Sequence, residues 1–299
     1  MTSLWMTSVV EEVLLILLCY VSFTFSVTTE LKYRHPSSPP HMTQALGNNK
    51  YPELNSRLFQ GDIFVPPIDE GRNAIRQDTY LWPNGIVPYT FDSSYTQEEA
   101  TRVESAMRRI ESKTCVHFVP YNGQQRDYIK INKEPGKGCF AMIGYRRNYQ
   151  GPHPVNYQSP ACLEYRGTVE HELLHVLGLL HEQARPDRDN HVDILWNNID
   201  QAYWSDFNKA SPYEVTTFNI PYNHKSVMHY PRFAFSKNGQ DTIVHKTKPK
   251  MELGQRNGAT NGDLEKIRRM YRCNKVTNKN GDDLDSFNEI DLDDDRSGE

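Results

Sequence analysis

Three closely spaced histidines restrict the folding of this chain more than any other feature. His171 and His175 are four residues apart, so on a helix their imidazoles project from one face and can bind the same metal ion. Gly178 can adopt a positive φ, which ends a helix and turns the chain back, and that turn brings His181 round as a third nitrogen ligand. The apolar residues of the segment lie on the opposite side, which we expect to be buried: Leu173, Leu177 and Leu180.

Glu172 lies between the first two histidines, angled to reach a water on the ion rather than the ion itself. Three neutral imidazoles hold zinc and leave one position for water, whose pKa falls from about 15.7 toward about 7. The zinc-bound water then attacks a peptide carbonyl, while Glu172 takes its proton as general base and passes it to the leaving amine. An amphipathic helix with surface histidines is the alternative for the short motif, but the third histidine argues strongly against it.

Composition excludes several classes of protein. Of the 299 residues, 37% are hydrophobic and 24% are charged, which is ordinary for a folded chain, and a mean hydropathy of -0.72 excludes a multi-span membrane protein. The net charge of -4 is unevenly distributed: residues 73–273 carry 26 basic and 22 acidic side chains, whereas residues 274–299 carry 3 and 9. Because Lys and Arg form no stripe, we expect no nucleic-acid partner.

The amino-terminal part predicts a secreted protein. The apolar run from Val13 to Phe25 would rise only about 20 Å as a helix, too short for a hydrocarbon core of about 30 Å. A signal peptide over residues 1–26 is therefore the prediction, although its first region carries Glu11 and Glu12 and no basic residue. A buried core helix is the alternative. After signal removal we expect no membrane association.

The rest of the chain divides into three parts. Residues 27–72 are rich in Pro, Ser, Asn and His, which predicts a poorly packed leader with an ordered patch at 59–63. The leader ends at Arg72, a site for a trypsin-like protease. Residues 73–273 have the patterning of a compact domain. The acidic tail, residues 274–299, has few apolar residues and is predicted to be disordered.

The patterning of the compact domain indicates an α+β fold with its strands in the first half of the domain. Apolar periodicity and capping residues predict helices over Thr96–Thr114, from near Thr168 to Gly178, and from Thr260 through Met270. Strands are predicted at Ile86–Phe91, Cys115–Tyr121, Tyr128–Asn132 and Cys139–Tyr145.

The extended histidine motif is the metzincin signature, and its continuation, Glu182-Gln183-Ala184-Arg185-Pro186-Asp187-Arg188-Asp189, resembles the astacin family of zinc endopeptidases in particular. Downstream, Ser226-Val227-Met228-His229-Tyr230 is similar to the Met-turn of that family. The resemblance covers residues 73–273 and part of the leader. It implies a metzincin-like, two-lobed zinc protease domain: a twisted mixed sheet and helices in the upper lobe, and a mostly irregular lower lobe with a C-terminal helix. A peptide would lie across the cleft, along an edge strand.

The resemblance also implies roles for individual residues. Met228 would form an apolar floor beneath the zinc. Tyr230 would ligate zinc in the resting site and swing away to stabilise the oxyanion during turnover. The family usually has Tyr-Asp-Tyr ahead of this turn, whereas this chain has Tyr222-Asn223-His224, so the nearby pocket differs from the usual pattern.

The leader contains a segment similar to the latency motif of the family, Phe59-Gln60-Gly61-Asp62. The resemblance implies that Asp62 occupies the open position of the zinc and keeps the precursor inactive; without it, Gly61-Asp62 would be interpreted as a simple turn. Cleavage after Arg72 by a trypsin-like protease would free the amine of Asn73. In the family this new terminus is buried against the residue after the third histidine, here Glu182.

The chain has five cysteines, and Cys19 would be removed with the predicted signal peptide, which leaves four. Four cysteines allow three pairings, and the spacing does not choose among them. The resemblance implies Cys115–Cys273 and Cys139–Cys162.

The sequence thus predicts a secreted, monomeric zinc endopeptidase made as a zymogen, acting on protein or peptide substrates. A catalytically silent binding protein on the same fold is the alternative, against which the intact Glu172 and ligand set argue. A purely structural zinc protein is disfavoured because three histidines and a general base leave an open site. His229 lies beside the Met-turn and is not a ligand in the family pattern. The other histidines are interpreted as surface or core residues without a metal role: His35, His41, His117, His153, His191, His224 and His245.

Overall fold

The computed structural model describes residues 51–55, 57–66, 80–213 and 215–273, which all belong to one compact unit. The expected signal (1–26), the expected cleavage point between Arg72 and Asn73, and the acidic tail (274–299) lie outside these residues. Within the described ranges, no helix has both the length and the apolar character needed to cross a bilayer.

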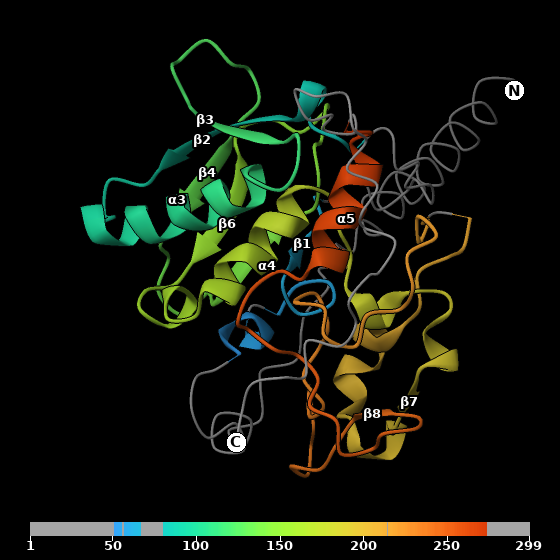
Figure 1. The fold of residues 1–299 in the computed structure, drawn as a ribbon. Coiled ribbons are helices and arrows are strands. Elements are labelled where there is room, and N and C mark those ends of the chain that lie inside the picture. The colour runs from blue at the N-terminus through green and yellow to red at the C-terminus, as the bar shows by residue number, and fades with distance from the viewer. Residues whose placement is uncertain (1–50, 56, 67–79, 214, 274–299) are drawn as a thin grey trace, which may run out of the picture. The chain divides into compact units, whose positions relative to one another are not determined.

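A six-stranded mixed sheet forms the larger part of the fold, with the strand order β1-β5-β6-β4-β2-β3 (Figure 1). The strands are β1 (Ile63–Phe64), β2 (Ile86–Phe91), β3 (His117–Pro120), β4 (Ile129–Asn132), β5 (Cys139–Met142) and β6 (His153–Tyr157). Only β5 and β6 pair in antiparallel fashion; every other neighbouring pair is parallel. Without β1, strand β5 would be an edge of the sheet.

Among the described residues, three α-helices accompany the sheet: α3 (Gln97–Glu111), α4 (Arg166–Val176) and α5 (Asn261–Met270). The capping box predicted for α3 is present, because Thr96 accepts from the backbone N–H of Glu99 and Glu99 accepts from that of Thr96. Helix α3 connects the parallel strands β2 and β3, and Figure 1 shows α3 and α4 across the same face of the sheet. The three predicted helices are therefore confirmed, with ends shifted by a few residues.

Two hydrophobic cores hold the described residues together. The first lies between the sheet and the helices and includes Val103, Ile131 and Leu173. The second is built mainly from residues 192–253 and contains Ile199, Phe207 and Phe235, beside a small antiparallel sheet of β7 (Val192–Ile194) and β8 (Ile243–His245). Seven short 3-10 turns complete the fold in the described part: Pro52–Asn55, Pro83–Gly85, Ala161–Leu163, Glu182–Ala184, Arg188–Asn190, Trp196–Asn198 and Gln201–Phe207.

The structure confirms the α+β class and corrects three details. Strands are not confined to the first half of the domain, since β7 and β8 lie in its second half. The C-terminal helix α5 does not belong with the irregular part: Leu264 and Ile267 are buried in the first core, so its apolar face packs with the sheet and helices. Leu180, expected on the buried side of the histidine segment, is only half-buried, whereas Leu173, Leu177 and every residue of α4 from Gly167 to Val176 are buried.

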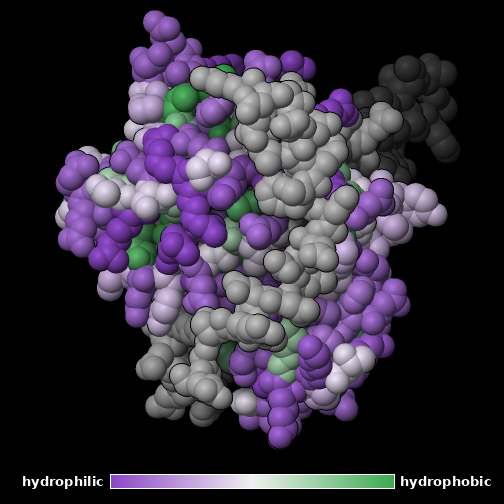
Figure 2. Space-filling model, in the orientation of Figure 1, coloured by the Kyte–Doolittle hydropathy of each residue, from purple (hydrophilic) through white to green (hydrophobic). Residues whose placement is uncertain are grey.

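The leader is also better packed than its composition predicts. Tyr51 and Leu54 are buried in the second core, and Ile63 is fully buried where β1 pairs with β5. The residues coloured by hydropathy in Figure 2 are mostly polar, with small apolar patches. The described leader residues therefore extend the second core and the sheet, which gives them the packing that their own sequence lacks.

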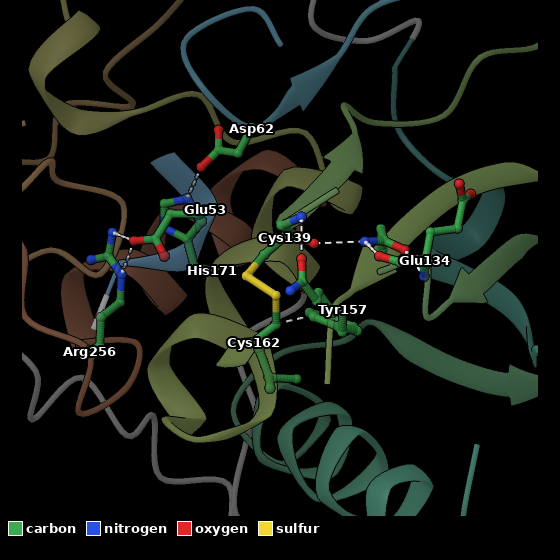
Figure 3. Close-up of a disulfide and its surroundings, with 12 residues drawn as sticks. Glu53, Asp62, Glu134, Cys139, Tyr157, Cys162, His171 and Arg256 are labelled. Carbon is green, nitrogen blue, oxygen red and sulfur yellow. Dashed lines mark hydrogen bonds and ion pairs between the residues drawn. A yellow bond between two sulfur atoms is a disulfide. The ribbon is translucent and has the colours of Figure 1, made fainter. Parts of the chain in front are cut away.

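Two disulfides connect distant parts of the chain. Cys115, just before β3, is bonded to Cys273, just after α5, with Cα atoms 5.3 Å apart. Cys139 in β5 is bonded to Cys162, with Cα atoms 5.8 Å apart (Figure 3). This is the pairing that the resemblance implies.

We predict that the double substitution Cys115→Ala and Cys273→Ala lowers the free energy of unfolding by about 5 kcal/mol. The bridge spans a sequence separation of 158 residues, and in the chain-entropy model closing so long a loop in the unfolded state has about this effect. Both cysteines are half-buried, so little packing is lost. The measurement is guanidinium unfolding of the full chain. The Ser double variant should lose the same amount, and a loss below about 1 kcal/mol in both would contradict the chain-entropy account.

Candidate metal centre

Helix α4 places two of the three candidate histidines inside the protein. His171 and His175 both have no exposed surface. The helix ends at Val176, and Gly178 has a φ of 105°, the left-handed conformation expected of it. The chain then turns back, and His181 arrives beside the other two as the spacing predicts.

The three rings meet the carboxylate of Asp62 at one buried point. Nε2 of His171 lies 3.1 Å from Nε2 of His175 and 3.3 Å from Nε2 of His181. The Asp62 oxygens lie 3.0 Å from Nε2 of His171, 3.5 Å from that of His175 and 3.3 Å from that of His181. The four ligand atoms all lie within 4.8 Å of one another, and Figure 3 shows Asp62 pointing at His171.

The opposite nitrogens fix the tautomer of each ring. Nδ1 of His171 lies 2.8 Å from the carbonyl oxygen of Val227, and Nδ1 of His175 lies 2.7 Å from that of Leu179. Nδ1 of His181 lies 3.0 Å from Oε1 of Gln60. Because an oxygen in these places accepts a hydrogen bond, each Nδ1 carries the proton and each Nε2 presents a lone pair.

The centre therefore contains three imidazole lone pairs and one carboxylate, with no hydrogen-bond donor among them. Burial lowers the pKa of His171 to about 3, so this ring stays neutral. Although burial alone would raise the pKa of Asp62, His181 and His175 beside it hold that pKa well below its usual value. A set of three neutral nitrogens and one anionic oxygen fits a zinc ion in both number and chemistry.

Glu172 is buried next to this centre and has no partner for its charge. Neither carboxylate oxygen has a hydrogen-bond partner, and the side chain is completely buried. Burial raises the pKa of Glu172 well above its usual value, and the negative charges of Asp62 and Glu53 raise it further. The described residues thus supply no hydrogen-bond donor to Glu172, whose two oxygens can accept hydrogen bonds from another molecule.

The turn at residues 226–230 supports the centre from the other side. Met228 is buried, and its carbonyl oxygen accepts from the backbone N–H of Glu182, the residue after the third histidine. The carbonyl oxygen of Val227 accepts from Nδ1 of His171. The turn is thus hydrogen-bonded to both segments that carry the histidines.

Tyr230 is bound to the leader. Its ring centroid lies 4.7 Å from that of His181, and its hydroxyl donates to the backbone carbonyl of Gln60 at 2.5 Å. The backbone N–H of Gln60 in turn donates to Asp206 at 3.1 Å. Gln60 therefore contacts a histidine, the tyrosine and an acidic residue at once, a role that the residue pattern alone did not predict.

A second buried contact joins the leader to the domain. Both Nε and Nη2 of Arg256 donate to Oε1 of Glu53, at 2.8 and 2.6 Å, and neither side chain is more than 1% exposed (Figure 3). Nη1 of Arg256 also donates to the carbonyl of Val227 at 3.0 Å, the same oxygen that binds His171. This ion pair therefore reaches the ring of a candidate ligand through one carbonyl group.

Glu182, expected to receive a new amino terminus, already has partners. One oxygen accepts from Arg185 at 3.1 Å and from the backbone N–H of Asn223 at 2.8 Å, and the other contacts Lys266. Beside it is a pocket whose lining includes Tyr80, Gly178, Glu182, Arg185 and Lys266. Asn73 itself lies outside the described residues.

Comparisons with known proteins agree with this geometry. Residues 74–272 match the model of the peptidase family described as Astacin. The low choriolytic enzyme of Oryzias latipes is 36% identical over 237 residues, covering 76% of this chain and 81% of that protein. The zinc metalloproteinases nas-7 and nas-4 of Caenorhabditis elegans are each 36% identical, over 72% and 70% of this chain, which spans 54% and 65% of their lengths.

A solved structure is similar as well. High choriolytic enzyme 1, a hatching enzyme zinc-protease from Oryzias latipes, superposes with a TM-score of 0.60 at 35% identity. The match covers 66% of this chain and 96% of that one. The similarity thus extends through nearly the whole of that structure.

We predict that the purified full chain contains about one zinc per molecule and that His175→Ala removes it, because two imidazoles and a carboxylate bind the ion far more weakly. Metal content is measured by mass spectrometry after dialysis. His245→Ala changes a half-buried histidine away from the centre and should leave the zinc content unchanged. Equal zinc in the two variants would contradict the assignment.

Proposed function

This chain belongs to the astacin family of peptidases, and on that premise we propose that it is a secreted zinc endopeptidase made as a latent precursor. The observation that carries the proposal is the convergence of His171, His175, His181 and Asp62 on one point. Two disulfides support secretion, since such bonds persist in oxidising compartments. The proposed organisation is a signal over 1–26, a pro-segment over 27–72, a catalytic domain over 73–273 and an acidic tail over 274–299.

The three histidines would hold the zinc, and Asp62 would occupy its remaining position in the precursor. Zinc supplies Lewis-acid chemistry to such a site, polarising a carbonyl oxygen and acidifying water. The carbonyl acceptors behind His171 and His175 keep these rings oriented and in one tautomer. Met228 would line the floor of the site.

Glu172 is the residue that we propose as general base. It directly follows the first ligand on α4, and its unpartnered oxygens can accept a proton when a substrate and water enter. Because it is held by a helix that is buried on all sides, its position does not depend on a flexible loop.

Tyr230 is the proposed donor to the oxyanion. Its hydroxyl already donates to a peptide carbonyl, that of Gln60, so the side chain can place its O–H on a backbone oxygen at this position. The same group stabilises negative charge when a carbonyl becomes tetrahedral. The resting-state contact of Tyr230 with zinc, as implied by the family, would form once the pro-segment leaves.

The path of the substrate is proposed from the sheet. Strand β1 pairs with β5 through Ile63 and Ala141 and covers an edge that would otherwise be open. When the pro-segment is removed, an extended peptide can add to β5 in its place and pass the zinc site. Protein or peptide substrates are therefore the proposed partners, and we expect the chain to act as a monomer.

Latency would rest on several contacts of the pro-segment. Asp62 fills the metal position, Glu53 is bound to Arg256, and Gln60 binds both His181 and Tyr230. A trypsin-like protease cutting after Arg72 would leave Asn73 as the first residue. Asn73 precedes Tyr80, which lines the pocket beside Glu182, by seven positions in the chain. Seven extended Cα-to-Cα steps can span up to about 24 Å, so the new terminus can reach that carboxylate.

The activated enzyme is predicted to lose about 10²–10⁴-fold in kcat/KM on casein when Glu172 is changed to Gln, because proton transfer by a general base contributes about this much. Gln keeps the size of the side chain, and zinc content should not change. Glu98→Gln, on the exposed start of α3, is the matched control. A wild type that binds zinc yet cleaves no faster than Glu172→Gln would favour the silent binding protein instead.

We also predict that Asp62→Asn gives a precursor with measurable activity before cleavage. The amide keeps the size of the side chain but loses the anionic oxygen that holds the metal position, and so competes poorly with water. The measurement is the ratio of activity before and after cutting at Arg72, with Asp193→Asn, an exposed residue, as control. An unchanged ratio in Asp62→Asn would remove this residue from latency.

A further inference from the structure

A buried lysine on α5 already occupies the carboxylate to which the new amino terminus is expected to bind. Lys266 contacts Oε2 of Glu182, and the two side chains are only 9% and 2% exposed. The other oxygen accepts from Arg185 and from the backbone N–H of Asn223. Both oxygens of Glu182 therefore have donors before any cleavage.

The charges around Glu182 are already balanced. Arg185 also binds Asp187 through Nε at 2.9 Å and Nη2 at 2.8 Å. Two carboxylates, Glu182 and Asp187, thus face two cations, Arg185 and Lys266. Because each carboxylate already has a cation, Glu182 does not need an arriving ammonium group as its counter-charge.

Lys266 lies on α5, which also contacts the 226–230 turn. Asp263, three residues earlier on α5, accepts from the backbone N–H of Val227 at 3.1 Å, in the turn that contains Met228. Lys266 binds Glu182, the residue directly after the third histidine. Residues three apart share one face of a helix, so one face of α5 contacts both segments that surround the metal position.

We propose that Lys266 is a positioning residue: it is the permanent counter-ion of Glu182 and makes the alignment of His181 and the 226–230 turn independent of the mature amino terminus. The proposal rests on the function proposed above, in which cleavage after Arg72 frees the amine of Asn73. That amine reaches a carboxylate that is already neutralised. It adds to the assembled site and is not needed to assemble it.

The test separates the two cations that can serve Oε2 of Glu182, Lys266 and the amine of Asn73; Arg185 stays on Oε1 in every variant. Inserting one Gly between Arg72 and Asn73 keeps the cleavage point but displaces the amine by one residue. Lys266→Met removes the charge and keeps much of the side-chain length, and Lys266→Arg keeps the charge. The insertion is made in the wild type and in both variants, each produced as the full chain and cut after Arg72. Urea midpoint, kcat and KM are measured for each.

In the wild type and in Lys266→Arg, we expect the insertion to change kcat/KM by less than about twofold, because the counter-ion remains in place. In Lys266→Met we expect the same insertion to lower kcat/KM by roughly tenfold or more, together with the urea midpoint, because Oε2 of Glu182 then has neither cation. The free terminus of Asn73 should partly rescue Lys266→Met when no Gly is inserted. A side chain that contributes only packing would not respond to the amino terminus in this way.

Equal effects of the insertion in the wild type and in Lys266→Met would overturn the proposal, because independent sites give additive changes. A large loss on insertion in the wild type alone would overturn it as well. The urea midpoints decide the question even if the wild type cleaves no substrate, so a failure of the proposed function is distinguished from a failure of this inference. Lys266→Gln, which keeps a hydrogen-bond donor without charge, replaces Lys266→Met if that variant does not fold.

Discussion

Four buried groups that can only accept hydrogen bonds meet at one point in this protein, and much of the described structure serves to hold them there. Three are Nε2 atoms of histidines, and the fourth group is the Asp62 carboxylate. Without a cation their lone pairs would repel one another in a region of low dielectric. Helix α4 is buried on every side to hold two of the rings, and the 226–230 turn is bonded to both segments that carry the ligands.

The described leader residues are as much a part of this arrangement as the domain itself. Ile63 extends the sheet, Tyr51 and Leu54 lie in the second core, and Glu53 forms a buried ion pair with Arg256. Each contact is modest, and their sum gives a segment of poor intrinsic propensity a defined conformation. In the proposed zymogen, the single ligand Asp62 would therefore be held both by its neighbour Ile63 and by contacts at residues 51–54, several residues earlier in the leader.

Sequence patterns predicted the parts of the site that are close together in the chain. The spacing of His171, His175 and His181 predicted that the three rings lie close together. The capping residues Thr96 and Glu99 predicted where α3 begins. Strand β6 was missed because Pro154 argues against a central strand. His224 and His245, interpreted as separate residues, stack with centroids 3.9 Å apart, a contact made by distant segments. The sequence did not indicate that Lys266 is buried against Glu182, since a charged residue on a helix ordinarily faces solvent.

The bond between Cys115 and Cys273 closes a covalent ring that contains every one of the candidate histidine ligands, Glu172 and Tyr230. A single break of the backbone anywhere inside this ring opens it without separating the molecule into two pieces. Loops such as the one around Tyr213, which is 98% exposed, are the natural places for such breaks. A nicked molecule would keep both halves of its metal site on one covalent framework.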